Sequence, residues 1–168
     1  EVVLNQLYKQ TQLQGKFNAQ MIALVDGAPR LLTIKELLSQ YLEFQVQIIT
    51  RRSIFRKERA IARKHIVEGL ILASDNIDEI IHIIKNSSTG EEAGLKLKER
   101  FGLSDEQVEA ILSMTLRRLS GMEKGKLLAE HEDILKTIAE LEHILSSRET
   151  ILEVVFGELA EINEKFGD

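Results

Sequence analysis

The apolar positions between residues 33 and 85 repeat in a way that predicts one long helix. This stretch has no proline, and Gly69 is its only glycine. Thr33 and Glu36 have the spacing of a capping box, which marks a helix start. Apolar residues then recur every seven positions, at Ile34, Tyr41, Ile48, Phe55 and Ala62. A helix of about fifty residues is about 80 Å long, so it must project from its domain and needs a second helix to cover its apolar seam.

A second apolar pattern near the carboxyl end supplies that partner. Its positions alternate in steps of four and three, with two polar exceptions: Leu127, His131, Ile134, Ile138, Leu141, Leu145, Arg148, Leu152, Val155, Leu159, Ile162 and Phe166. This a/d pattern is typical of a coiled coil. Ser146 and Glu149 have capping spacing, which would interrupt the helix there. The segment between the two helices is too short for a parallel return, so we expect antiparallel pairing in which facing residue numbers sum to about 198.

Residues 66–84, at the far end of the long helix, are apolar on nearly all sides. Such a helix is buried all round, so this end must enter a globular head. Further capping signals predict short head helices, at Thr89 with Glu92, Ser104 with Gln107, and Ser120 with Glu123. Gly102 is expected to end the first of them. The second is expected to carry Val108, Ile111, Leu112, Leu116 and Leu119.

The amino-terminal residues predict a short helix over 1–12 and a small hairpin over 17–32. An apolar run from Met21 to Val25 leads into a turn that begins at Asp26. The fold class is therefore mainly α: a long antiparallel coiled coil with a small helical head, plus a minor β-hairpin near the amino terminus. A lone hairpin is marginal in water, and the chain begins with Glu1 rather than Met. We therefore expect a piece of a longer polypeptide.

Composition excludes several classes of protein and of site. A net charge of −5 argues against a chain that is polybasic throughout. The absence of cysteine excludes disulfides, thiol nucleophiles and cysteine-based metal sites, and is in keeping with a cytosolic protein. The four histidines, His65, His82, His131 and His143, lack metal-ligand spacing. We predict no catalytic residue, no metal site and no membrane segment in this chain.

A basic run over residues 51–64 has two interpretations. Arg51, Arg52, Arg56 and Arg63 are candidate contacts to DNA phosphates, which arginine neutralises without reading bases. The alternative is a solvated face that pairs with acidic residues of the returning helix, such as Glu130 and Glu142. We favour the alternative, because the predicted partner helix is acidic and we expect no aromatic residues to interleave with the arginines.

Several segments together resemble the A subunits of the bacterial type IIA DNA topoisomerases, DNA gyrase and topoisomerase IV. They are residues 1–14, Phe17, 21–27, 50–52, 63–70, Ile77 with Asp78, 116–123 and 166–168. The resemblance covers the whole chain, and residues 10–14 are more similar to gyrase. The chain departs from the usual family residues at Lys57, Glu58, Lys64, Ser113 and Thr115.

The resemblance implies four regions. Residues 1–32 would end a tower-like region, and residues 33–65 would form the first coiled-coil helix. Residues 66–122 would form the exit-gate (C-gate) head, and residues 123–168 the returning coiled-coil helix. The family cuts one DNA duplex with a tyrosine of a winged helix, and a second duplex leaves through the exit gate. Tyr8 and Tyr41 do not lie in that tyrosine's motif, so the chain is expected to lack the cleaving residue.

The resemblance also implies partners and cofactors. A subunits form a homodimer, for which the head residues Ile111, Met114, Leu116, Leu119 and Met122 are the candidate interface; the alternative is that they form the head's own core. The other expected partners are double-stranded DNA and the DNA gyrase B subunit, in the cytoplasm and at the nucleoid. No cofactor is expected on this chain, since ATP and Mg²⁺ would be bound by other domains or subunits.

Two other functions remain open from the sequence. One alternative to a gyrase fragment is a fragment of the A subunit of topoisomerase IV. A coiled-coil arm that binds RNA or a protein client is the alternative from another class, and it predicts an exposed, basic tip. A free-standing enzyme is disfavoured because the sequence has no phosphate-binding loop and no nucleophile paired with a base.

Overall fold

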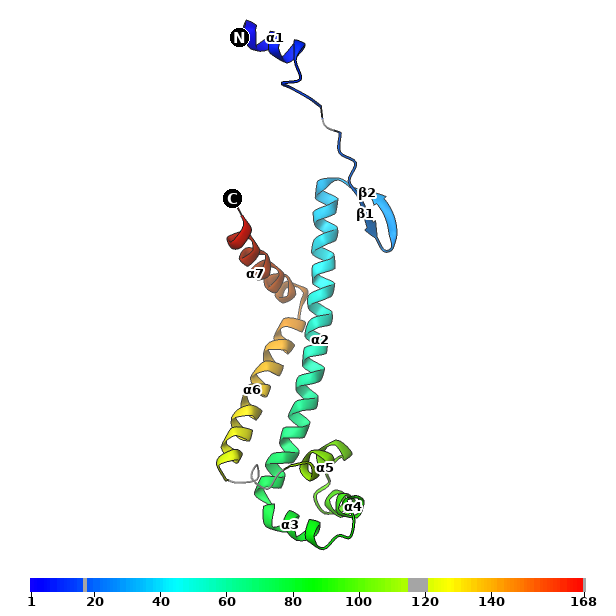
Figure 1. Ribbon diagram of the computed structural model, residues 1–168, viewed down its shortest axis with the longest axis vertical. Helices are drawn as coiled ribbons and strands as arrows, with labels where there is room; N and C mark the ends of the chain where they lie inside the picture. Colours follow the sequence, from blue (N-terminus) through cyan, green and yellow to red (C-terminus); the bar gives the residue numbers. More distant parts are fainter. Residues whose placement is uncertain (17, 115–120, 168) are drawn as a thin grey trace. The chain divides into compact units, whose positions relative to one another are not determined.

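The computed structural model describes residues 1–16, 18–114 and 121–167 (Figure 1). The chain divides into two compact units, Glu1–Gln45 and Val46–Asp168. Helix α2, Ile34–Asp75, begins in the first unit and continues into the second. No helix in the described ranges is long and apolar enough to cross a membrane.

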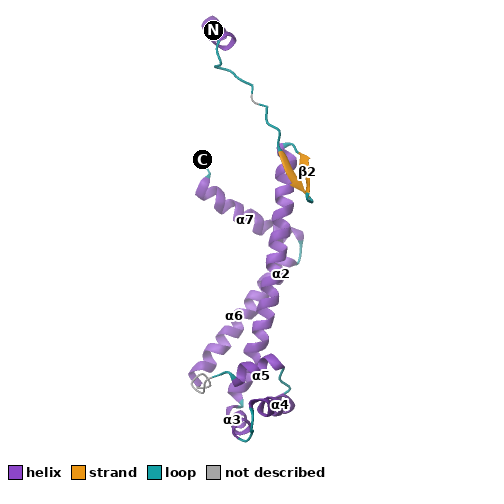
Figure 2. Cartoon of the chain, turned by 45° about the vertical axis from the view of Figure 1, so that its right-hand side comes forward, coloured by secondary structure: helices purple, strands orange, loops and turns teal. Residues whose placement is uncertain are grey.

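The amino-terminal unit contains α1, Val2–Gln10, the strands β1, Ile22–Val25, and β2, Ala28–Leu31, and the start of α2. The two strands pair antiparallel, with Val25 opposite Ala28 (Figure 2). Asp26 and Gly27 both have positive φ, 53° and 78°, as the tight hairpin turn favoured by an Asp-Gly pair requires. The predicted short helix and hairpin are confirmed, and the turn occupies only these two residues.

The predicted capping box at the start of α2 is present. The backbone N–H of Thr33 donates to Glu36 Oε2 at 2.8 Å, and the N–H of Glu36 donates to Thr33 Oγ1 at 3.3 Å. These bonds satisfy backbone donors that have no partner within the helix. They also lower the pKa of Glu36, chiefly through the backbone hydrogen bond from Thr33.

In the carboxyl-terminal unit, α6, Gly121–Leu145, runs beside α2 (Figures 1 and 2). The seam predicted for α6 is confirmed, because its members are buried or half-buried: Leu127, His131, Ile134, Ile138, Leu141 and Leu145. Lys57 Nζ lies 2.9 Å from Glu142 Oε1, and Glu68 Oε1 lies 3.3 Å from His131 Nε2. Both pairs have the antiparallel register predicted from the sequence.

The seam predicted for α2 is wrong within this unit. The side of α2 that is buried or half-buried runs along Val46, Ile49, Ser53, Lys57, Ala60, Lys64 and Val67. Phe55 is 59% exposed and Ile48 is 38% exposed, so the seven-residue recurrence faces away from α6. The helix carries apolar residues on more than one side, and the strongest repeat is not the side that packs.

The returning element is two helices rather than one. α6 ends at Leu145, and α7, Arg148–Phe166, begins after a short interruption. The interruption was predicted, but its cap is Ser147, whose Oγ accepts from the N–H of Thr150 at 3.3 Å. The change of phase turns Ile151 inward in place of the predicted Leu152. Val155 and Leu159 of the predicted seam are buried or half-buried, whereas the predicted Ile162 and Phe166 are exposed. Ile151 and Val155 then form a small buried cluster with Ile49 of α2.

The long helix also ends earlier than predicted. Instead of continuing to residue 85, α2 stops at Asp75, and α3, Ile77–Lys85, begins after Asn76. The side-chain amide of Asn76 donates to the carbonyl of Leu72 at 2.9 Å. Asparagine side chains compete in this way with the backbone ladder of a helix. The break lets α3 turn so that Ile80, 1% exposed, joins the head core.

Two short helices complete the head: α4, Gly90–Phe101, and α5, Asp105–Leu112. Their predicted caps are present, with Thr89 before α4, the Ser104–Gln107 capping box before α5, and Gly102 at φ 68° between them. The core that they build with α2 and α3 contains Leu70, Ala73, Ile80, Leu97, Leu103, Val108 and Ile111. α5 ends at Leu112 rather than reaching the predicted Leu119. Leu116, Leu119 and Ser120 lie outside the described residues.

Acid should loosen the start of α4. The N–H of Ser88 donates to Glu92 Oε2 at 2.8 Å, and Lys96 Nζ donates to Glu92 Oε1 at 2.7 Å. These contacts, Lys96 first, lower the pKa of Glu92 below its ordinary value. Because the pKa of Glu92 is lower in the folded than in the unfolded chain, ionised Glu92 stabilises the fold. This stabilisation is complete above the pKa of the unfolded chain and is lost as the pH falls through the pKa of the folded chain. We expect the Glu92→Gln variant to lose less stability than the original chain between about pH 6 and pH 3, measured by urea unfolding.

Glu91→Gln is the matched control, because Glu91 occupies the same first turn but makes no ion pair with a described residue. An equal reduction of acid sensitivity in both variants would contradict the role of Glu92.

Candidate basic surface and head interface

Five arginines between residues 51 and 63 lie on one side of α2. At 100° per residue, Arg52, Arg56, Arg59 and Arg63 follow one another in steps of four and three along a single stripe, and Arg51 lies at its edge beside Phe55. We call these five arginines the basic band. The band includes the four predicted phosphate contacts and Arg59, which belongs to the predicted basic run but is not among those four.

Two arginines of the band are paired within the chain. Arg52 Nη2 lies 2.5 Å from Glu158 Oε1 of α7, and Arg63 Nε lies 2.6 Å from Glu130 Oε1 of α6. All four side chains are partly exposed, so each pair contributes about 0–1 kcal/mol. The predicted pairing of the basic run with acidic residues therefore holds for part of the run, and it fixes register more than stability.

The remaining arginines of the band are available to a partner. Arg51 and Arg56 are exposed and make no ion pair with any described residue. The guanidinium carbon of Arg59 lies 5.8 Å from the centroid of the exposed Phe55 ring. An aromatic side chain thus does interleave with the arginines, contrary to the expectation from the sequence. The signal was the spacing of four between Phe55 and Arg59, which places them on the same side of a helix.

The residues predicted for the head interface divide into three groups. Ile111 is 3% exposed and belongs to the head core, so its apolar surface is used within the chain. Met114 is half-buried and packs against that core. Leu116 and Leu119 lie outside the described residues, as does the side chain of Met122 in α6. A homodimer interface at these residues remains a prediction.

An apolar cavity of about 270 Å³ lies beside Met114, between α3 and the end of α5. Its lining is Ile80, Ile81, Ile84, Lys85, Ile111, Leu112 and Met114. Ile84 and Leu112 are 39% and 36% exposed at its edge. The head therefore has accessible apolar surface beside the residues that the sequence singled out.

A group of hydrogen bonds attaches the head to α2. Gln107 is 8% exposed, and its side-chain nitrogen donates to the carbonyl of His65 at 2.7 Å. His65 Nε2 lies 2.7 Å from Ser104 Oγ. A Cβ on Gly69 would approach Gln107 Cγ to 2.8 Å, so only glycine allows α5 this close to α2. The sequence offered no sign of this contact, which joins residues about forty positions apart along the chain.

The described residues contain no group of three histidine, aspartate or glutamate side chains that could hold a metal ion. His65, His82 and His131 instead contact Ser104, Asn86 and Glu68. The desolvation that accompanies its partial burial opposes ionisation of Glu68, but hydrogen bonds from His131 and the charge of Lys64 still lower its pKa. These contacts serve the packing of the arm and head.

The amino-acid sequence is similar to known proteins over nearly its whole length. Residues 1–160 match the family model that describes the A subunits of DNA gyrase and topoisomerase IV. The chain is 48% identical over 167 residues to the DNA gyrase A subunit of Clostridium acetobutylicum, and 49% identical to those of Staphylococcus aureus and Staphylococcus epidermidis. These alignments cover 99% of this chain and 19–20% of the relatives, so the chain spans about one fifth of their length.

Proposed function

Because the chain belongs to the family of DNA gyrase and topoisomerase IV A subunits, we propose that it is the arm and exit-gate region of such a protein. In this assignment, residues 1–32 end a tower-like region, and residues 33–65 and 123–168 form the arm. Residues 66–122 are the head that holds two A subunits together. The observation that carries the proposal is an antiparallel pair of helices, α2 and α6, that ends in a compact helical head with accessible apolar surface.

The arm gives the gate its reach. α6 has 25 residues, so it is about 38 Å long at 1.5 Å per residue. A contact between two heads at the end of such arms can close a space and reopen it without disturbing the rest of the dimer. We expect a modest interface rather than a large obligate one, because it must break in each cycle.

The whole protein would be an ATP-dependent, type IIA DNA topoisomerase that changes DNA supercoiling. Its A subunits would act with DNA gyrase B subunits on double-stranded DNA in the bacterial cytoplasm, at the nucleoid. This chain would contribute no catalytic residue, and ATP and Mg²⁺ would be bound elsewhere. The relatives' names support gyrase over topoisomerase IV. An arm for an RNA or protein client is supported less, since the basic band lies along α2 and not on the head.

Sedimentation of the chain tests the gate. We expect a concentration-dependent dimer at tens of micromolar, and Leu112→Glu should weaken it at least about tenfold by placing a charge in the apolar contact. Leu135→Glu is the matched control, because Leu135 is similarly exposed, at 41%, but lies on α6. A chain that stays monomeric at these concentrations would overturn the gate assignment, and equal weakening by both variants would exclude Leu112 from the contact.

Binding to a duplex of about 30 base pairs tests the predicted DNA contacts. Arginines that neutralise phosphates release counterions, so each contact contributes about 0.9 to the slope of log affinity against log salt. We expect Arg51→Gln with Arg56→Gln to weaken binding at low salt and to reduce that slope by up to about 2. Lys85→Gln with Lys165→Gln removes the same charge away from the band and should change binding less. No binding by the original chain at low salt would exclude the DNA contacts.

A further inference from the structure

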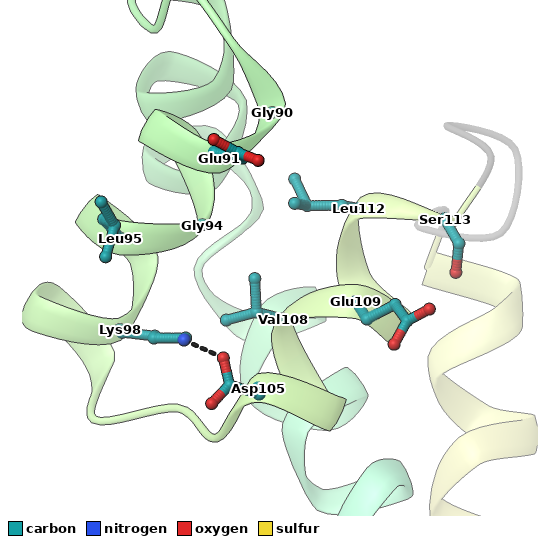
Figure 3. A pocket seen from close by; sticks show the side chains of 10 residues that line it. All are labelled: Gly90, Glu91, Gly94, Leu95, Lys98, Asp105, Val108, Glu109, Leu112 and Ser113. Atoms are coloured by element: carbon teal, nitrogen blue, oxygen red, sulfur yellow. Dashed lines mark hydrogen bonds and ion pairs between the residues drawn. The ribbon is translucent and has the colours of Figure 1, made fainter.

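A groove between α4 and α5 forms a second hollow on the head, which shares only Leu112 with the cavity beside Met114. Its volume is about 780 Å³, and its lining is Gly90, Glu91, Gly94, Leu95, Lys98, Asp105, Val108, Glu109, Leu112 and Ser113. The residues from α4 share one side of that helix, and those from α5 share one side of theirs. Figure 3 shows Val108 pointing into the space between the two helices, with Leu112 and Glu91 pointing toward each other across it.

The floor of the groove is apolar and tightly packed. Val108 is 6% exposed, and Gly94 is buried beneath it. A Cβ on Gly94 would lie 3.2 Å from Val108 Cγ1, so the helices meet as closely as glycine permits. Leu95 is 61% exposed and Leu112 is 36% exposed along the walls. Apolar walls above a well-packed floor suit the apolar side of an amphipathic helix laid between them.

The charges around the groove are predominantly negative. Glu91, Asp105 and Glu109 line it against a single base, Lys98. Lys98 is already paired with Asp105, and that pair closes one end of the groove (Figure 3). Glu91 and Glu109 make no ion pair with a described residue; Glu91 points into the groove, and Glu109 lies on its outer rim along α5 (Figure 3). The two unpaired carboxylates would attract lysine or arginine and repel DNA phosphates.

From the apolar floor and the acidic rim, we propose that the groove docks a basic amphipathic helix of another protein. Its apolar residues, spaced three or four apart, lie over Val108 between Leu95 and Leu112. One lysine or arginine of the docked helix faces Glu91 inside the groove, and another reaches Glu109 on the outer rim. A second copy that presented this same face would bring like charges together, which disfavours a homodimer through the groove. Leu112 lines both the groove and the cavity beside Met114, so the variants that test the groove are placed at Glu91, Glu109 and Gly90, which line the groove but not that cavity.

Titration with designed peptides tests the groove. The probe is a fluorescent peptide of about 18 residues, long enough to form helix, with leucines on one side and lysines on the other. A second peptide carries glutamate in place of every lysine. We expect the lysine peptide to bind the full chain at least about tenfold more tightly than the glutamate peptide. Equal binding of the two peptides, or no binding of the lysine peptide, would overturn the proposal.

Two pairs of variants locate the site. Glu91→Gln with Glu109→Gln should weaken lysine-peptide binding several-fold, whereas Glu132→Gln with Glu153→Gln, at exposed positions on α6 and α7, should not. A Cβ on Gly90 or on Gly125 meets nothing within 4 Å, so both positions accept a side chain. Gly90→Leu narrows the groove and should weaken binding about tenfold, and Gly125→Leu on α6 is its control.

The same preparations are examined by sedimentation. If Gly90→Leu disrupts a dimer but leaves the affinity for the peptide unchanged, the groove belongs to a contact between copies and the proposal is overturned. If the chain is monomeric and still binds the lysine peptide through the groove, the exit-gate assignment is overturned and the groove proposal is supported.

Discussion

Replacing Leu97 by alanine should lower the free energy of unfolding of the head by about 2–5 kcal/mol. Leu97 is 0% exposed and lies in the core that joins α2, α3, α4 and α5. The substitution removes buried apolar surface and leaves a cavity, because the closely packed helices around it relax only partly into the space. Since the same core orders the surface beside Met114, the variant should also dimerise more weakly than the original chain.

The measurement is urea unfolding followed by circular dichroism. Leu95→Ala is the matched control: it makes the same chemical change in the same helix, but Leu95 is 61% exposed. We expect the control to change stability by less than about 1 kcal/mol. Equal shifts of the two unfolding midpoints would mean that the core around Leu97 does not hold the head together.

The second large effect is expected on the arm, where Ile49→Ala should cost about 2–5 kcal/mol. Ile49 is 1% exposed, and its cluster with Ile151 and Val155 contains the apolar side chains that fasten α7 to α2. Beside this cluster, α7 has the partly exposed ion pair between Arg52 and Glu158, which contributes about 0–1 kcal/mol. The cluster therefore dominates, and its loss should release α7 while α6 stays paired.

Amide hydrogen exchange distinguishes this outcome from general destabilisation. Amides around Ile151 and Val155 should exchange faster in Ile49→Ala, while those around Ile138 and Leu141 of α6 change little. Ile54→Ala is the control, because Ile54 lies on the same helix and is 43% exposed. Uniformly faster exchange along both α6 and α7 would contradict a local role for the cluster.

The parts of the fold that the sequence predicted well are held by interactions within a few residues. The caps at Thr33, Thr89 and Ser104 each form between a side chain and a backbone group three positions away. Gly102 ends α4 because its left-handed conformation is open to glycine. The seam of α6 was also predictable, since that helix has a single apolar side facing one partner.

The wrong seam of α2 has its origin in competition between partners far apart in the sequence. α2 carries Ile48 and Phe55 on one side and Val46 and Ile49 on another, so its sequence alone does not say which side packs. Polar side chains such as Ser53 lie within the true seam, where Ser53 is 3% exposed. A seam prediction that considers only apolar residues places Ser53 on the solvent-exposed side of α2.

The candidate sites also combine features that the sequence predicted with features that only the structure showed. The arginines of residues 51–64 were evident from the sequence, but which of them are paired depends on where Glu130 and Glu158 come to lie. Arg59 and Phe55 gained their significance from sharing one exposed side of α2. The groove between α4 and α5 depends on how closely Gly94 lets the two helices approach, which no single segment reveals.

By itself, the sequence determined the helical class, the caps, the hairpin turn, the antiparallel register of the arm and the family. Each of these depends on local hydrogen bonds, on the period of a helix, or on specific motifs. Only the tertiary structure decided the packed side of α2, the change of phase at Ser147, the break at Asn76 and the attachment of Gln107 to His65. The packed side of α2 and the attachment of Gln107 depend on contacts between residues distant along the chain and on how closely side chains fit together. The interruptions at Ser147 and Asn76 are made by local hydrogen bonds, and the burial of Ile151 and Ile80 then fixes how α7 and α3 continue.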